Sequence, residues 1–309
     1  MFLKQLHRII FLVFLFSVSL AAQDSKRLMA ERALTEAELL EKVWWVPGNL
    51  EKKLIECEKA LAIWRELSDK KREADTLLLI AKAEIYLNDR GGKSEKSKLL
   101  SGQAMEIFKT LGDTEGEAFA LRNIALQETF DSFERGKSFF ERALTLARQS
   151  KSQKAQTEIL DLFARVSSSN GESEKALEML DEALQIARKS KDTIDEANVN
   201  FAYGLTYWHI GDYEKSLAHY EQAHKLFKEF GDLSWATTSI ENAALVYNLL
   251  DQPEKVLESY REALPFRRDN KHITAIADNL TSIATALVKL NQPQKALENL
   301  DESMQIYLL

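Results

Sequence analysis

The sequence repeats itself about every 40 residues, and this period is its strongest constraint on the fold. Lys175, Lys215, Lys255 and Lys295 lie 40 residues apart in similar segments. A small residue recurs in the same way, at Ala60, Ala104, Ala143, Ala183, Ala223, Ala263 and Ser303, with intervals of 44, 39, 40, 40, 40 and 40 residues. Self-similarity at a fixed spacing of this length is typical of arrays whose repeats pack on their neighbours.

Each repeat predicts a pair of helices. In the second helix, a mostly bulky residue stands three positions before the small residue, at Cys57, Ser101, Phe140, Leu180, Tyr220, Tyr260 and Leu300. Leu, Met or His follows the small residue directly, so three side chains share one helical face. The pattern predicts second helices near residues 51–67, 95–111, 134–150, 174–190, 214–230, 254–268 and 294–309.

A first helix precedes each of these, and it carries its own small residue. Gly204, Ala244 and Ala284 recur 40 residues apart in these first helices. Turn residues fall between the predicted helices. Gly112-Asp113 and Gly231-Asp232 place a glycine suited to a left-handed helix end before an aspartate suited to cap the next helix. With little glycine and proline in the chain, 11 and 4 residues, the sequence predicts an all-α fold.

Four irregularities interrupt the repeat. The polar run at 167–170 predicts that the helix there ends early or frays, and Pro265 predicts a kink or an end at Leu264, because an interior proline costs ~3 kcal/mol. Four extra residues around 89–92 predict a longer turn. The tryptophans at 44–45 are expected to cover the open end of the array.

The N-terminal segment has the features of an export signal. Lys4 and Arg8 precede an apolar run of about ten residues from Ile9 to Val18, whereas a spanning helix needs ~20. Small residues follow the run. We expect a signal peptide over residues 1–22, cleaved near Ala21 or Ala22, which would leave a periplasmic or secreted array over 23–309. A retained membrane anchor is the alternative.

Charge and cysteine content limit the possible partners. The formal net charge is −7, and loss of Lys4 and Arg8 would make it −9, which disfavours nucleic acid and, after cleavage, an anionic membrane as partners. Cys57 is the single cysteine, so the chain forms no intramolecular disulfide. We expect Cys57 to be an inert core thiol.

The sequence predicts no catalytic site, cofactor or metal. None of the nucleophile-elbow, phosphate-loop, dinucleotide or zinc patterns occurs. His219 and His224 are five residues apart on one predicted helix, which separates them by ~140° and prevents shared metal ligation. His224 stands where other repeats have Leu or Met, so we expect a partly buried packing histidine.

The repeat resembles the tetratricopeptide repeat (TPR). The resemblance rests on a small residue, a second one twelve positions later, an aromatic residue four later and an alanine three after that: Gly204, Ser216, Tyr220 and Ala223, and again Ala244, Val256, Tyr260 and Ala263. It covers about residues 26–309. The standard repeat has 34 residues, so this one is similar to the longer subclass of kinesin light chains and of N-terminal regions of bacterial regulators and CHAT-type peptidases. The resemblance implies a right-handed α-solenoid of about seven helix-turn-helix units.

The resemblance also implies a binding surface on a concave wall of first helices. Its exposed positions lie three before, one after and four after the small residue. They are Asp161, Arg165 and Ser168; Phe201, Leu205 and Trp208; Glu241, Leu245 and Asn248; and Thr281, Thr285 and Val288. Among these, Phe201, Leu205 and Trp208 form an apolar patch flanked by Arg165, Glu241 and Asn248, the composition of a peptide-binding surface. The alternative is that these aromatic residues pack between repeats.

Two known TPR binding patterns are incomplete or missing. Asn123 and Asn242 stand two before the small residue, where kinesin-light-chain repeats often contact the ligand backbone, but Ala202 and Ser282 replace Asn elsewhere. The Lys and Asn clamp of chaperone-binding TPRs has no counterpart, because Phe201 and Leu205 occupy matching positions. Chaperone-tail binding is therefore not expected.

These observations lead to three functional hypotheses. The first is an exported, non-catalytic scaffold that holds a protein or peptide segment. The second is the sensing or docking arm of a longer enzyme, such as a CHAT-type peptidase or a signalling kinase, with its catalytic domain beyond residue 309; the apolar residues of the last predicted helix favour it. The third is self-association through that same helix.

Overall fold

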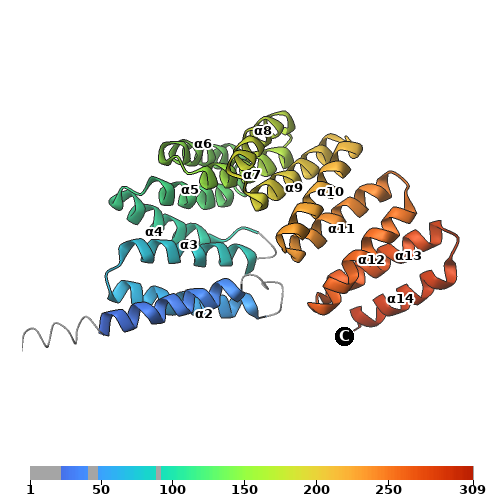
Figure 1. Cartoon of the computed structure of the whole chain (residues 1–309), viewed down its shortest axis with the longest axis horizontal. Coiled ribbons are helices and arrows are strands. Elements are labelled where there is room, and N and C mark those ends of the chain that lie inside the picture. Colours follow the sequence, from blue (N-terminus) through green and yellow to red (C-terminus); the bar gives the residue numbers. More distant parts are fainter. Residues whose placement is uncertain (1–21, 41–47, 88–91, 309) are drawn as a thin grey trace, which may run out of the picture. The chain divides into compact units, whose positions relative to one another are not determined.

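The computed structural model describes residues 22–40, 48–87 and 92–308 (Figure 1). The chain forms two compact units, one up to Gln127 and one from Glu128 to Leu309. The predicted signal peptide at 1–22, apart from Ala22, lies outside the described residues, as do Trp44-Trp45 and the extra residues at 89–91.

The described residues are helical throughout and contain no strand, which confirms the all-α fold of paired helices. The first unit holds a helix over residues 22–40, then α2 Asn49–Glu66, α3 Lys70–Leu87 and α4 Glu95–Leu111, and α5 Thr114–Thr129 crosses the boundary. The second unit holds α6 Phe133–Ser150, α7 Gln153–Ser169, α8 Ser173–Ser190, α9 Thr193–Ile210, α10 Tyr213–Phe230, α11 Leu233–Leu249, α12 Pro253–Asp269, α13 Ile273–Lys289 and α14 Pro293–Tyr307. Of the described helices, none is long and apolar enough to span a membrane.

Helices in the second unit follow one another as hairpins (Figure 1). Each packs on its neighbour in sequence, and α7 also packs directly against α9. The predicted small residues lie at the centre of these contacts, since Ala183, Ala223 and Ala263 are fully buried. The bulky residues beside them, such as Leu180 and Tyr220, are buried as well. The spacing therefore identified the helix faces that pack together.

Gly204 shows how closely the helices of a pair approach. A Cβ atom at this position would lie 2.6 Å from Cδ1 of Tyr220 on α10, which is closer than carbon atoms can pack. The Ser216 hydroxyl donates a hydrogen bond to the Gly204 carbonyl at 2.7 Å. Glycine is thus needed where α9 and α10 come closest.

The predicted turn chemistry is confirmed. Gly112 and Gly231 adopt left-handed conformations with φ of 69° and 92°. Asp113 then accepts a hydrogen bond from the Gly116 amide at 2.9 Å, and Asp232 accepts one from the Trp235 amide at 3.0 Å. These caps satisfy amide groups that the helix itself leaves unpaired.

The expectation that the helix at 167–170 ends early is wrong, because α7 continues to Ser169. Its last turn is held by side chains that bond back to the helix. The Ser169 hydroxyl and the Asn170 side-chain amide both donate to the Val166 carbonyl, at 2.9 and 2.8 Å. Polar residues here complete the helix end, as serine and asparagine commonly do.

Pro265 does not stop its helix either, since α12 continues to Asp269. The proline lies on the exposed side of the helix. The carbonyl of Arg261, which loses its intrahelical partner, is therefore on the side where water can reach it. Beyond the proline, buried Arg267 is bonded to Glu241 of α11, which fixes the last turn.

Candidate functional site

The predicted binding positions of the second unit lie on α7, α9, α11 and α13. We call the side chains three before, one after and four after the small residues of these helices the first-helix wall. Residues 40 apart hold equivalent places on it. The side chains of this wall become more exposed from α7 to α13. Asp161 and Ser168 on α7 are buried, whereas Leu245 on α11 and Val288 on α13 are 53% and 59% exposed.

On α7 the wall is closed by internal contacts. Arg165 is half-buried, and its Nη2 lies 2.9 Å from Oδ2 of Asp161. The buried Ser168 hydroxyl lies 2.9 Å from Nδ1 of His209 on α9. Of the three predicted positions here, Arg165 has the largest exposed surface.

On α9 the predicted aromatic patch divides in two. Phe201 packs edge-on against Tyr220 at 5.4 Å and against Trp235 at 5.2 Å between ring centroids. It therefore fills space between α9, α10 and α11, as the packing alternative expected. Leu205 is half-buried and Trp208 is 42% exposed, so Trp208 is the accessible aromatic residue of the predicted patch.

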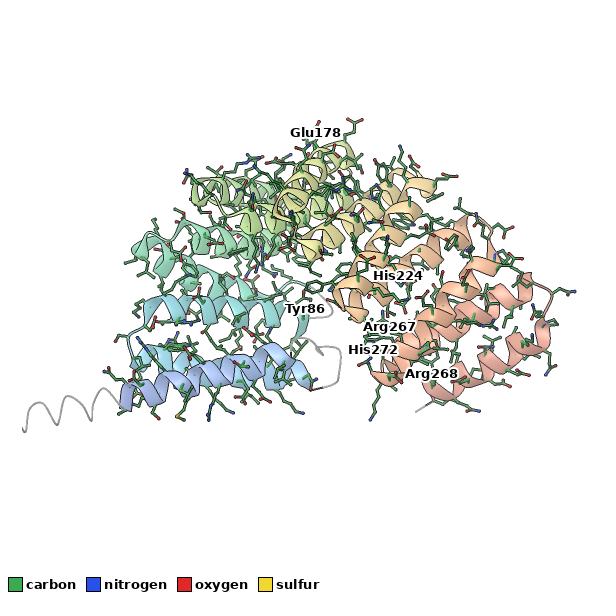
Figure 2. The ribbon with its side chains drawn as sticks, viewed as in Figure 1. Tyr86, Glu178, His224, Arg267, Arg268 and His272 are labelled. Carbon is green, nitrogen blue, oxygen red and sulfur yellow. The ribbon has the colours of Figure 1, made fainter. Side chains whose placement is uncertain are left out.

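On α11 Glu241 belongs to a buried polar network. Arg267 of α12 donates to both of its carboxylate oxygens, from Nε at 3.0 Å and from Nη2 at 2.5 Å. Asn279 of α13 donates to the same carboxylate at 2.8 Å. Figure 2 shows Arg267 beside His272, whose Nδ1 lies 2.9 Å from Arg267 Nη1. Glu241 thus ties three helices together.

The two asparagines predicted on α11 also have partners within the protein. Asn242 is half-buried and donates from its side chain to the Thr238 carbonyl at 2.8 Å. Asn248 is exposed and accepts from Lys289 Nζ at 3.2 Å. Asn248 is therefore the asparagine that lies at the accessible surface.

What remains accessible is an apolar surface on three successive first helices. Its members are large side chains that are half-buried or exposed, and we call them the wall patch: Leu205, Trp208, Leu245, Leu249 and Val288. Leu249, 52% exposed, was not among the predicted residues. It lies four residues after Leu245 on the same helical face, and this spacing was the signal that could have revealed it.

Two cavities are lined by residues outside the wall patch. One, of about 270 Å³, lies among α10, α11 and α12, and His224, Leu233, Ile240, Glu262 and Phe266 contribute to its lining. The other, of about 600 Å³, is in the first unit between the helix over 22–40 and α2. His224 is the partly buried packing histidine that was expected (Figure 2). Its Nδ1 lies 2.8 Å from the Ala236 carbonyl, and its Nε2 lies 3.2 Å from Glu262.

Other polar aromatic groups of the second unit hold helices together. The His219 ring stacks on Tyr203 and Tyr207, with centroids 4.6 and 5.5 Å apart. Burial lowers the pKa of His219, which favours the neutral ring in this stack. The Tyr203 hydroxyl donates to Asp181 of α8, and burial together with this carboxylate raises the tyrosine pKa.

Comparison with known proteins agrees with the repeat geometry. A family model described as tetratricopeptide repeat matches residues 195–269, which hold most of α9 and all of α10, α11 and α12. This chain contains tetratricopeptide repeats. No match is found among curated proteins. The similarity of its 40-residue repeat to the longer TPR subclass rests on the sequence alone.

Several solved structures share the fold of this TPR protein at low identity. A signal transduction ATPase with a tetratricopeptide repeat sensor, from Pyrococcus horikoshii, has a TM-score of 0.65 at 17% identity over 94% of this chain, which spans only 46% of that protein. Aspartyl phosphate phosphatase F from Bacillus subtilis has a TM-score of 0.62 at 15% identity, covering 96% of this chain and 74% of the other. A Rap protein in complex with competence and sporulation factor has a TM-score of 0.60 at 17% identity, covering 79% and 64%.

Proposed function

We propose that the TPR protein binds a segment of another protein across the wall patch. The observation that carries this proposal is the exposure of large apolar side chains on α9, α11 and α13 in equivalent or adjacent repeat positions. Clustered apolar surface of this kind marks interaction sites in soluble proteins. Trp208 supplies an aromatic anchor, the residue type most often responsible for binding energy at interfaces.

The surroundings of the wall patch suit a polypeptide ligand. Asn248, Thr281 and Thr285 are exposed beside it. Each is hydrogen-bonded within the protein, but amide and hydroxyl groups can form further hydrogen bonds to a bound main chain. A Rap protein of similar fold is known in complex with competence and sporulation factor. A non-catalytic scaffold that holds a protein segment accounts for both features.

Replacing Trp208 with alanine tests the site. A random dodecapeptide library displayed on phage would be selected on the immobilised protein, and the most enriched peptide synthesised. We expect W208A to weaken binding of that peptide by at least about tenfold, because truncation of an interface anchor costs ~2 kcal/mol or more. Fluorescence anisotropy measures the dissociation constant.

Phe230→Ala is the matched control for this experiment. Phe230 is an exposed aromatic residue, 58% accessible, but it lies at the end of α10, a second helix. We expect F230A to bind the selected peptide as the wild type does. If W208A binds normally, or if both variants weaken binding equally, the wall patch is not the ligand site.

We also propose export as part of the function, supported by Lys4, Arg8 and the apolar run that follows them. The docking arm of a longer enzyme is the second candidate. In its favour, Leu297 and Met304 of α14 are 53% and 60% exposed, whereas the equivalent Leu257 and Leu264 of α12 are buried. The intact mass of the endogenous protein separates the two proposals. A mass roughly 2 kDa below 35.3 kDa supports cleaved export, and a much larger mass supports the docking arm.

A further inference from the structure

Three equivalent junctions between successive first helices in the second unit have different chemistry. Each junction combines three residues: one from a first helix, one from the second helix that follows it, and one from the first helix of the next repeat. Corresponding residues of successive junctions are 40 positions apart in the sequence. The three sets are Asp161, Ala187 and Asp195; Phe201, Phe227 and Trp235; and Glu241, Arg267 and Ala275. The set around Phe201 is an aromatic cluster, with Trp235 at 5.2 Å from Phe201 and 5.9 Å from Phe227. The set around Glu241 is an ion pair.

The junction of Asp161 and Asp195 lacks the cation that its counterpart has. Where Arg267 neutralises Glu241, the equivalent residue is Ala187, which is fully buried and carries no charge. None of the three residues of this set is aromatic, and α7 and α9 pack directly against each other. Two carboxylates therefore meet at this junction without a cation from α8.

Asp195 is the uncompensated member of the pair. It is 7% exposed, and among the described residues its side chain has no hydrogen bond or ion pair, while Arg165 is engaged with Asp161. Charges of Asp192, Glu158 and Asp161 act on it, and the opposing Lys154 is 71% exposed and 4.0 Å from Glu158. A buried carboxylate in such a place is costly unless a cation pairs with it.

The residues at this junction favour an organic cation over a metal ion. No group of three His, Cys, Asp or Glu side chains in the described part of the chain is placed to hold a metal ion. We propose that the junction of Asp161 and Asp195 binds the ammonium or guanidinium group of a lysine or arginine in the protein segment held by the wall patch. This inference rests on the proposed function. It makes the ligand a segment in which a basic residue lies beyond the apolar contacts, at the α7 end of the wall.

The dodecapeptide library also tests this proposal, by selection in parallel on the wild type and on Asp195→Asn. We expect peptides from the wild type to be enriched in Lys or Arg at a fixed distance from apolar residues. Peptides from D195N should keep the apolar residues and lose the basic one. The best wild-type peptide should bind D195N at least tenfold more weakly, and its analogue with norleucine for the basic residue should bind both proteins equally.

Asp301→Asn is the matched control, because Asp301 is an exposed aspartate on α14, far along the chain from the junction. It should leave peptide affinity unchanged, and circular dichroism would verify that both variants are folded. Equal enrichment of basic residues on wild type and D195N would overturn this inference and leave the proposed function intact. No enriched peptide at all, or peptides insensitive to W208A, would overturn both.

Discussion

Replacing Arg267 with methionine is expected to lower the free energy of unfolding around α11–α13 by about 3–5 kcal/mol. Arg267 is 8% exposed, and its guanidinium holds both oxygens of Glu241 as well as Thr238 Oγ1 at 3.2 Å. Methionine keeps most of the volume but leaves Glu241 buried without a cation, supported only by Asn279. Because repeats contact only their neighbours, the loss should be local. Hydrogen exchange of amides in α11–α13, compared with those in α7 and α8, measures it.

Two further variants show whether the uncompensated charge causes this loss. Arg268→Met removes the neighbouring arginine, whose ion pair with Glu302 is about half exposed on both sides, and we expect a change within ~1 kcal/mol. The double variant with Glu241→Met and Arg267→Met replaces both charges, so it should recover much of the stability lost in R267M. A double variant as unstable as R267M would show that packing of the guanidinium, and not the ion pair, is responsible.

The sequence was sufficient to predict the helix pairs because their contacts repeat. A small residue at positions such as Ala223 recurs in the second helices, and the bulky residues three positions before it, such as Leu180, Tyr220 and Tyr260, are buried in the same way. Glycine and aspartate at Gly231-Asp232 mark a helix boundary by local conformation alone. Such features depend on residues close together in the sequence or on their regular spacing, so a single sequence is enough to predict them.

The candidate site was harder to predict because exposure on the wall depends on partners far away in the chain. Phe201, Glu241 and Thr281 hold the same repeat position, yet the first is packed against Trp235, the second is paired with Arg267, and the third is exposed. The partners of Phe201 and Glu241 lie 34 and 26 residues away on other helices, and Thr281 has a third kind of partner, the hydroxyl of Ser303, 22 residues away. The position of a residue in the repeat therefore predicts the helix face on which its side chain lies, but not which other side chains cover it.

Pro265 and the polar run at 167–170 also show that local sequence does not reveal the contacts that decide the structure. The local sequence predicted that the helix at 167–170 would end early or fray and that Pro265 would kink its helix or stop it at Leu264. In α12 the proline is exposed and Arg267 fixes the following turn, so tertiary contacts outweigh the local cost. In α7 the side chains of Ser169 and Asn170 bond to the helix that they were expected to end.

Asp195→Asn is expected to stabilise the second unit at neutral and alkaline pH by on the order of 2–4 kcal/mol. Burial, with the charges of Asp192 and Glu158, raises the pKa of Asp195 from 3.8 to about 7. The folded protein therefore disfavours the ionised carboxylate. Well below pH 4 the carboxyl is protonated in both the folded and the unfolded state and costs nothing. Between about pH 4 and pH 7 the unfolded chain loses this proton while the folded protein keeps it, so the wild type loses stability over this range, which the amide does not, and the loss is complete above about pH 7. Thermal unfolding between pH 4 and pH 8 measures the difference between the two proteins.

The gain of D195N over the wild type should thus be near zero at pH 4 and largest at pH 8, whereas D301N on exposed Asp301 should show no such trend. A gain that does not change with pH would mean that the ionised carboxylate is not the source of the cost. Proteins often depart from the most stable choice of residue at functional sites. If that function is to receive a basic side chain, a saturating selected peptide should pair with Asp195, lower its pKa and restore stability to the wild type at pH 8. The advantage of D195N should then shrink in the presence of that peptide.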